Sequence, residues 1–278
     1  MHQSLTDKTH LQKPDSTRGL RFRASAIGGV HRAFVRASGS PLLLALSVAM
    51  AMMAFFTMRP DIDLNVSRQF WMDGFLLSQD EFLLSVRDLN RMLPPVLVSG
   101  LVCMLFLMPF WGRLPRLFPP HKLLLITVFF LLGPGALVHV LKTAFGRARP
   151  RHLVEFGGDL FFTPVLSLDG GCVRNCSFPS GESASAIALL AFTILLPEKF
   201  RLIGTAILAP FIVIVSLNRV AMGAHFFSDV LIAWPLMFAV FLLLHWPFTQ
   251  NRHAIDAAFL RKARRMPVAM QPRSLAEQ

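Results

Sequence analysis

The 278-residue chain is 54% hydrophobic and only 16% charged, which is too apolar for an ordinary soluble domain. Its net charge of +12 does not indicate nucleic-acid binding, because the excess of Lys and Arg lies mainly in the two terminal segments rather than on one folded face. The composition therefore predicts a single all-α integral membrane domain.

Six apolar segments are long enough, alone or with a few flanking residues, to cross the hydrocarbon core of a bilayer. We expect them to form a six-helix membrane domain over residues 41–248, between polar, basic tails at 1–40 and 249–278. Residues 69–93 mix aromatic and charged residues in a pattern that predicts either a helix lying on the outer membrane surface or a helix that packs over the bundle. The six predicted spans are 41–58, 94–111, 123–141, 183–196, 202–217 and 229–248.

The distribution of Lys and Arg predicts the orientation, because these residues are retained on the cytoplasmic side of spans. Residues 1–40 contain seven Lys or Arg against two acids, and residues 249–278 contain six against two. Both tails are therefore predicted to be cytoplasmic, and the loop 142–182 to face the outside. That outer loop still contains five Lys or Arg, which indicates that they bind an anion.

Three short motifs lie at the predicted outer ends of the spans. They combine cations, a hydroxyl beside a glycine, an imidazole and two carboxylates, and membrane segments rarely carry such groups unless they are functional. Together these groups can bind a phosphate and attack it with a histidine. The motifs are Lys142 to Pro150 (K-x6-R-P), Pro179 to Glu182 (P-S-G-E) and Arg219 to Asp229 (R-x5-H-x3-D).

This combination resembles the type 2 phosphatidic acid phosphatase superfamily, whose members remove phosphate from lipid phosphates and pyrophosphates. The resemblance implies a metal-independent helical enzyme with its site at the outer membrane edge. Two positions differ from the usual pattern. The third motif begins with Asn218 where the family usually has Ser, and the second ends with Glu182 where the family usually has His.

Several cations of the first and third motifs are candidates for holding the substrate phosphate. Lys142, Arg149 and Arg219 are the predicted clamps, since Arg offers a forked set of donors that matches phosphate oxygens. Arg147 and Arg151 are additional candidates. No metal ion or other cofactor is predicted, because these side chains can themselves neutralise the phosphate.

The second and third motifs supply the predicted chemistry. Ser180 can donate its hydroxyl, and Gly181 lets the backbone approach an anion at a helix start. His225 precedes Asp229 by four residues, so a helix makes them neighbours and leaves one ring nitrogen available for attack on phosphorus. The resemblance implies the same roles, and it places Glu182 where the family has its general acid. A protonated Glu182 can fill that role; alternatively the leaving group needs little help, or another residue donates.

Cys172 and Cys176 lie just before the second motif. On the outer side of a bacterial inner membrane, which is an oxidising compartment, we expect them to form a small disulfide loop. A zinc site that includes His152 is a weaker interpretation, because C-x3-C lacks a second pair of ligands.

The sequence thus predicts a bacterial inner-membrane phosphatase that acts on a lipid phosphate monoester at the periplasmic edge of the bilayer. The run from Cys172 to Glu182 is similar to a proteobacterial branch that includes lipid A phosphatases, so lipid A is the expected substrate, with the 4′-phosphate preferred over the 1-phosphate. Undecaprenyl pyrophosphate phosphatase and phosphatidylglycerophosphate phosphatase are alternatives. A transporter would carry its charges near mid-span, and a phosphate-lipid binding protein without turnover is expected if Glu182 cannot act.

Overall fold

A computed structural model of the chain describes residues 40–110 and 114–264. Among these residues no strand occurs, and the only β pairing is an isolated bridge between Leu153 and Leu160. The described residues from Ala45 onward form one compact unit. The predicted N-terminal tail lies almost entirely outside the described residues, so its cytoplasmic location stays a prediction.

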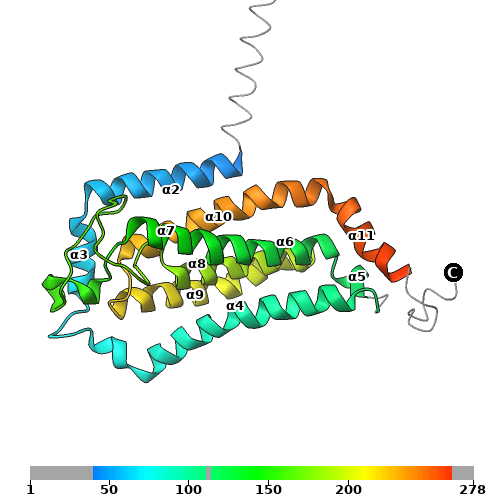
Figure 1. The fold of residues 1–278 in the computed structure, drawn as a ribbon. Helices are drawn as coiled ribbons and strands as arrows, with labels where there is room; N and C mark the ends of the chain where they lie inside the picture. Colours follow the sequence, from blue (N-terminus) through cyan, green and yellow to red (C-terminus); the bar gives the residue numbers. More distant parts are fainter. Residues whose placement is uncertain (1–39, 111–113, 265–278) are drawn as a thin grey trace, which may run out of the picture. The chain divides into compact units, whose positions relative to one another are not determined.

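Five helices within the described residues are long and apolar enough to cross a membrane (Figure 1), which confirms an all-α multi-pass membrane protein. They are α2 (Pro41–Met58), α4 (Glu81–Leu107), the helical run Pro120–His152, α9 (Glu198–Ala221) and α10 (Phe227–Gln250).

The remaining predicted span, 183–196, corresponds to the shorter apolar helix Gly181–Leu195. It consists of α8 (Gly181–Ala188) followed by the 3₁₀ segment η5 (Leu189–Leu195). A 3₁₀ helix rises more per residue than an α-helix, so the two segments together extend about 26 Å. This length approaches the roughly 30 Å of a hydrocarbon core, although the helix has fewer residues than the other five.

The third span is irregular. It consists of α6 (Pro120–Phe130), the π-helical segment η2 (Leu131–Leu137) and α7 (Val138–Phe145). Pro134 lies inside η2 and has no N–H to donate, which interrupts the regular α-helical hydrogen bonding. Gly146 then ends α7 in the left-handed conformation, with φ of 55°, where a Cβ would lie 2.7 Å from the Gly170 carbonyl oxygen. Lys142 is thereby placed in the last turn of α7.

The segment before the second span differs from the predicted surface helix at 69–93. The chain instead forms α3 (Asp61–Arg68) and a short 3₁₀ turn η1 (Leu76–Gln79), and α4 begins at Glu81 rather than near residue 94. Asp80 caps α4 by accepting a hydrogen bond from the Leu83 N–H at 2.9 Å. The prediction of a separate helix over 69–93 was therefore wrong, because residues 81–93 are the first part of α4 and residues 69–80 form a loop that contains η1.

Helix α8 packs against α4, α9 and α10, and also against η2 (Figure 1). Its buried faces carry small residues, including Ala184 and Ala186, which let neighbouring helices approach closely. As a result the first turn of α8 lies beside the ends of α7 and α9 and the start of α10. The second motif is thus brought to the other two.

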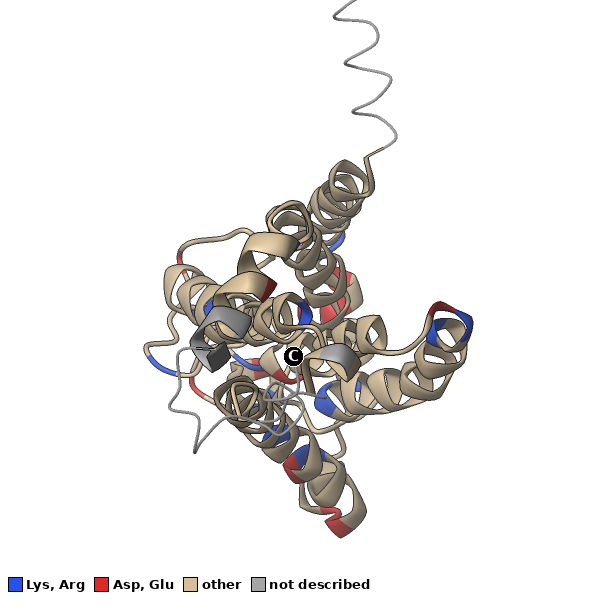
Figure 2. Cartoon of the chain, turned by 90° about the vertical axis from the view of Figure 1, so that its right-hand side faces the viewer, with Lys and Arg blue, Asp and Glu red and all other residues tan. Residues whose placement is uncertain are grey.

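Charged residues are sparse along the helices (Figure 2). The short helix α5 (Leu114–Leu117) precedes α6, and α11 (Arg252–Arg264) follows α10 within the predicted C-terminal tail. Asp256 of α11 accepts hydrogen bonds from the backbone N–H of His121, at 2.9 Å, and contacts its ring nitrogen Nδ1. The described part of this tail is therefore a helix that docks on the start of α6.

Candidate active site

The three sequence motifs meet where α7, α8, α9 and α10 come together. Lys142 belongs to the last turn of α7, and Arg219 to the last turn of α9. Asp229 lies in the first turn of α10. The following motif side chains are almost completely buried: Arg149, Ser180, Arg219, His225 and Asp229. Burial of so many polar groups in a membrane protein indicates a functional site.

His225 lies in the tight turn between α9 and α10. Its backbone N–H donates to the Arg219 carbonyl at 3.2 Å, which ties the turn to the end of α9. Gly223 permits the turn because its φ is +61° and because a Cβ there would lie 2.5 Å from the ring of Phe75. The backbone that precedes residue 225 therefore fixes its position.

The two ring nitrogens of His225 face different partners. Nδ1 lies 3.8 Å from an Asp229 carboxylate oxygen and 3.4 Å from the Ser177 hydroxyl, which itself hydrogen-bonds to the same Asp229 oxygen. Nε2 lies 3.2 Å from the Glu182 carboxylate. Burial, together with the charge of Lys142, lowers the pKa of His225 below its ordinary value of 6.5. The ring therefore favours its neutral form near pH 7, as a nucleophile requires.

Arg147 does not contact Glu182 or the Nε2 side of His225. Its guanidinium is buried and donates to Asp229 Oδ1 at 2.5 Å, to Ser228 Oγ at 2.8 Å and to Asp63 Oδ2 at 2.8 Å. It also lies over the ring of Phe226, with 4.3 Å between Cζ and the ring centroid. Arg147 is thus the buried counter-ion of two carboxylates, and its assignment as a phosphate-binding candidate is wrong.

Asp63 of α3 is a member of the site that sequence reasoning missed. Its Oδ1 accepts the backbone N–H of Ser228 at 2.9 Å, and its other oxygen accepts the Ser228 hydroxyl. Asp63 thereby joins α3 to the start of α10 and completes the chain Asp63, Arg147, Asp229. Its sequence neighbourhood is a polar, acidic segment, in which one aspartate gives no signal of burial.

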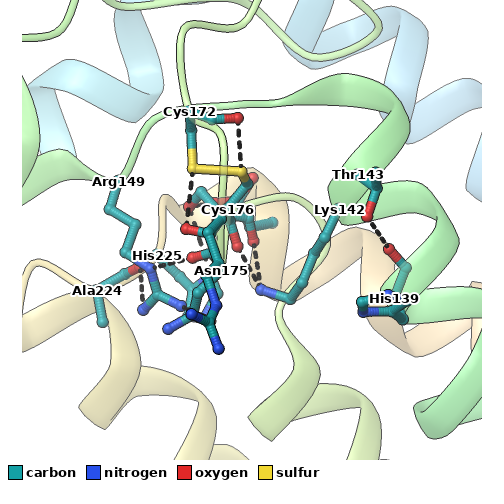
Figure 3. Close-up of a disulfide and its surroundings, with 12 residues drawn as sticks. His139, Lys142, Thr143, Arg149, Cys172, Asn175, Cys176, Ala224 and His225 are labelled. Atoms are coloured by element: carbon teal, nitrogen blue, oxygen red, sulfur yellow. Dashed lines mark hydrogen bonds and ion pairs between the residues drawn. A yellow bond between two sulfur atoms is a disulfide. The ribbon is translucent and has the colours of Figure 1, made fainter.

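Arg149 and Lys142 both contact the segment that precedes the second motif (Figure 3). Arg149 donates from Nε to the Asn175 carbonyl at 2.9 Å and from Nη2 to the Asn175 side-chain oxygen at 2.8 Å. Lys142 Nζ donates to the Cys176 carbonyl at 2.5 Å. A guanidinium has five N–H groups. Two of those of Arg149 bond to Asn175 and one bonds to the Ala224 carbonyl, so two remain for a ligand.

Glu182 is surrounded by positively charged or basic groups. Its Oε1 accepts from Arg91 Nη2 at 2.9 Å and lies 3.5 Å from Arg219 Nη2, while Oε2 faces His225 Nε2. Arg91 belongs to α4 and is a second residue that the sequence analysis missed. The side chain of its neighbour Asn90 donates to the Glu182 backbone carbonyl at 3.1 Å, which fixes α4 against the start of α8.

Ser180 and Gly181 form the beginning of α8. The Ser180 hydroxyl oxygen caps the helix by accepting a hydrogen bond from the Ser183 N–H at 3.3 Å. The backbone N–H of Ser180 donates to the Asp229 carbonyl at 3.0 Å. A Cβ at Gly181 would lie 3.5 Å from Val138 and 3.8 Å from the Lys142 side chain, which are ordinary contacts. Packing within the protein therefore does not itself require a glycine at this position.

A pocket of about 420 Å³ lies next to Glu182. One part of its wall is polar and includes Arg91 and Glu182, and the other part is apolar. Such a pocket fits an amphiphile better than a fully polar solute. The apolar lining includes Pro94, Pro95, Val98, Phe130, Leu131 and Pro134.

Cys172 and Cys176 form a disulfide, with 5.6 Å between their Cα atoms. The zinc alternative required both thiols together with His152, which instead lies exposed and contacts the Arg151 side chain at 3.4 Å. In the described part of the chain, no group of three or more His, Cys, Asp or Glu residues is arranged to hold a metal ion.

Residues 123–253 match the family model of the PAP2 superfamily, the type 2 phosphatidic acid phosphatases. All three motifs lie inside this segment. This segment, which is just under half of the chain, is assigned to the PAP2 superfamily. Asp63 and Arg91 lie outside the segment that matches the PAP2 model, so their positions beside the motifs come from the structure alone.

Curated relatives narrow the comparison within the PAP2 superfamily. The lipid A 4′-phosphatase of Rhizobium leguminosarum is 43% identical over 115 residues, which are 41% of this chain and 49% of that protein. The lipid A 4′-phosphatase of Francisella tularensis subsp. novicida is 29% identical over 196 residues, 68% of this chain and 87% of that protein. A lipid A 1-phosphatase of Rhizobium etli is 38% identical over 98 residues, 35% of this chain and 38% of that protein. The chain spans about half the length of the Rhizobium 4′-phosphatases that it matches.

A solved PAP2 structure, the phosphatidylglycerolphosphate phosphatase from Bacillus subtilis, aligns with 75% of this chain and 96% of its own. The two chains are 20% identical and the TM-score is 0.48.

Proposed function

We propose that the protein is an integral membrane phosphatase that hydrolyses a phosphate monoester of lipid A through a phosphohistidine at His225. The observation that carries this proposal is the position of His225 Nε2, which faces an anion bound between Arg91 and Arg219. In the resting structure that anion is the Glu182 carboxylate. The relatives named as lipid A phosphatases support the lipid A headgroup, and the greater identity to a 4′-phosphatase favours the 4′ position.

The Glu182 carboxylate marks the place that a substrate phosphate would take. It lies 3.2 Å from His225 Nε2, which is within the separation expected for a nucleophile poised for attack. Arg219 is buried, and its Nε has no hydrogen-bond partner among the described residues. A phosphate at this place would gain that donor together with the two N–H groups that Arg149 retains. We therefore expect Glu182 to turn aside when the substrate binds.

The reaction then follows from the groups around His225. The Nε2 lone pair attacks phosphorus, the P–O bond to the lipid breaks, and the electron pair leaves on the lipid oxygen. Asp229 stabilises the positive imidazole through Nδ1, directly and through Ser177. Glu182 loses its cation partners to the phosphate, which favours its protonated form, and it donates that proton to the leaving oxygen. In the second step Glu182 accepts a proton from the water that attacks phosphorus, the P–N bond breaks, and its electron pair returns to His225 as phosphate is released.

The proposed exchange of Glu182 with the phosphate predicts a double effect of Glu182→Gln. The amide no longer competes for Arg91 and Arg219, so the inhibition constant of inorganic phosphate should fall severalfold. Turnover of an alkyl phosphate should fall by about 10²- to 10⁴-fold, as for other general acids. An aryl phosphate should lose much less, because its leaving group needs little protonation.

Steady-state kinetics on both substrates, with phosphate as an inhibitor, measure these effects. Ser185→Ala is the matched control, because Ser185 lies one turn further along α8 and lines the same pocket. An equal loss on both substrates, with unchanged phosphate inhibition, would assign Glu182 a positioning role only.

The substrate assignment is tested by mass spectrometry of lipid A from Gram-negative cells with and without the gene. We expect lipid A to lose one phosphate, and fragment masses should assign the loss to the 4′ position. Cells that express His225→Ala should keep both phosphates. Unchanged lipid A, together with phosphate release from undecaprenyl pyrophosphate by the purified protein, would move the assignment to that alternative.

We propose that the site faces the periplasm from the inner membrane and that both termini are cytoplasmic, because of the charge asymmetry of the sequence. Single cysteines can be introduced in a Cys103→Ala background at Phe161, which is 79% exposed, and at His253 of α11. An impermeant maleimide added to spheroplasts should label position 161 and not position 253. Labelling at 253 but not at 161 would reverse the orientation.

A further inference from the structure

A five-residue ring, 172–176, is closed by the disulfide and lies against Lys142 and Arg149 of the first motif. Arg149 and Lys142 reach it from opposite sides (Figure 3). Arg149 bonds to Asn175 and Lys142 bonds to Cys176, which are consecutive residues of the ring. The two phosphate-binding candidates of the first motif therefore share one support.

Asn175 holds Arg149 with two acceptors. Its backbone carbonyl binds Nε and its side-chain oxygen binds Nη2. The backbone of Asn175 is in the left-handed region, with φ of 55°, which Asn adopts more readily than most other residues. This conformation belongs to a very short ring, in which the disulfide limits the alternatives that the backbone can sample. The orientation of Arg149 thus depends on the ring conformation.

Lys142 is held by the end of the same ring. Its ammonium donates to the Cys176 carbonyl at 2.5 Å and lies 3.5 Å from the carbonyl of Ser177. An ammonium has three donors, so the carbonyls fix the direction of the side chain without using all of them. Movement of the chain at residue 176 would therefore displace Lys142 as well as Arg149.

Backbone hydrogen bonds dock both ends of the ring on the first motif. The Cys172 N–H donates to the Gly146 carbonyl at 2.9 Å, and the Ser177 N–H donates to the Arg147 carbonyl at 2.8 Å. By contrast, the Val173 side chain is 96% exposed. The ring thus has one face that supports the site and another that is free for control substitutions.

We propose that the 172–176 ring is the positioning element for Arg149 and Lys142, and that tight binding of the substrate phosphate requires the closed disulfide. This rests on the proposed phosphatase function. With the disulfide open, residues 173–175 gain conformational freedom, and ordering them again opposes phosphate binding. The loss should therefore appear mainly as a higher KM, with a smaller change in kcat.

Asn175→Ala and Asn175→Gly separate the contributions of the ring. Glycine keeps the left-handed backbone and its carbonyl but removes the side-chain acceptor, so kcat/KM should fall about tenfold, as for loss of a hydrogen bond to a charged group. Alanine also disfavours the backbone conformation and should lose more. In combination with Arg149→Ala, either change should add little, because both act through one contact.

The disulfide is tested with the Cys172→Ser/Cys176→Ser double variant and with Val173→Ala as the matched control. The double variant, and reduced wild-type protein, should raise KM about 10- to 100-fold, and reoxidation should restore only the wild type. Val173→Ala should behave as wild type. A thermal-shift titration with inorganic phosphate measures phosphate affinity, which depends on Arg149 and Lys142, without requiring turnover. It also shows that each variant is folded.

The two proposals fail in different ways. Wild-type protein that binds phosphate but releases none from lipids would overturn the proposed phosphatase function. The phosphate titration would still test the positioning role of the ring. Unchanged KM and phosphate affinity after reduction and in the Asn175 variants would overturn the ring proposal, as would a wild-type protein that does not bind phosphate.

Discussion

Replacing His225 by alanine should abolish turnover and leave the protein folded. Among the described motif residues, His225 is the group placed to attack phosphorus, because its Nε2 faces the anion site and its Nδ1 is supported by Asp229 and Ser177. Loss of a nucleophile removes the covalent pathway, so kcat should fall on the order of 10⁴-fold or more. Steady-state rates on a lipid phosphate and an aryl phosphate measure the loss.

Ser216→Ala is the matched control for this experiment. Ser216 is buried in α9 close to the motif, and its hydroxyl accepts from the Trp234 indole at 3.3 Å, away from the phosphate-binding residues. The control should keep most of the wild-type rate. Activity of His225→Ala above about a tenth of wild type would contradict covalent catalysis at this residue.

Protonation of His225 should produce the acid limb in the dependence of kcat/KM on pH. His225 attacks in its neutral form, and burial lowers its pKa. The value of kcat/KM should therefore rise with pH through a midpoint below the ordinary 6.5 and then level off, as far as His225 controls it.

Replacing Arg147 by alanine should damage folding rather than phosphate binding. Arg147 is fully buried and pairs with Asp63 and Asp229, which are themselves buried. Its removal leaves two carboxylates without a counter-ion in the protein interior. Breaking a buried ion pair by removing one partner typically costs about 3–5 kcal/mol, so we expect a large loss of thermal stability or of folded protein.

Two further variants separate this role from phosphate binding. Arg147→Ala combined with Asp63→Asn should recover part of the stability, because one unpaired charge is removed. Arg149→Ala should stay near the wild-type unfolding temperature and lose phosphate affinity. The unfolding temperature in detergent, measured with and without inorganic phosphate, distinguishes loss of stability from loss of phosphate binding in these variants. An Arg147→Ala protein of normal stability that no longer binds phosphate would place Arg147 in the phosphate site instead.

The residues of the site that were predictable from sequence lie within short local patterns. His225 and Asp229 were correctly predicted to be neighbours, although His225 lies in the turn before α10 and not on the helix with Asp229. The positions of Ser180 and Gly181 follow from a helix start. The apolar runs gave the spans because each is close to the length that a bilayer requires. The meeting of the three motifs was expected from their position at the outer ends of the spans and from the resemblance to a family.

Other residues of the site depend on tertiary packing and leave no local signal. Asp63 contacts Ser228 across 165 positions in the chain, and Arg91 contacts Glu182 across 91. Both lie among other charged residues between the first two predicted spans. Arg147 and Arg149 are two residues apart, so composition treats them alike, and the path of the backbone after Gly146 decides which one is buried with carboxylates.

The boundary of α4 was missed for a similar reason. The predicted span began at residue 94 because the apolar run begins there, yet Pro94 lies inside α4. Two tertiary hydrogen bonds hold the earlier turns in place. Asn90 donates to the Glu182 carbonyl, and the Asn218 side chain donates to the Leu83 carbonyl at 2.8 Å.

Transfer of the substrate phosphate to His225 can be measured directly. Purified protein is mixed with lipid A that carries a radiolabelled 4′-phosphate, quenched with alkali within milliseconds to seconds, and digested for mass spectrometry. We predict a labelled, acid-labile phosphohistidine on the peptide that contains His225, formed and lost at rates compatible with turnover and absent from His225→Ala. Release of labelled phosphate at the full rate with no label on His225, or with label on another residue, would contradict this account.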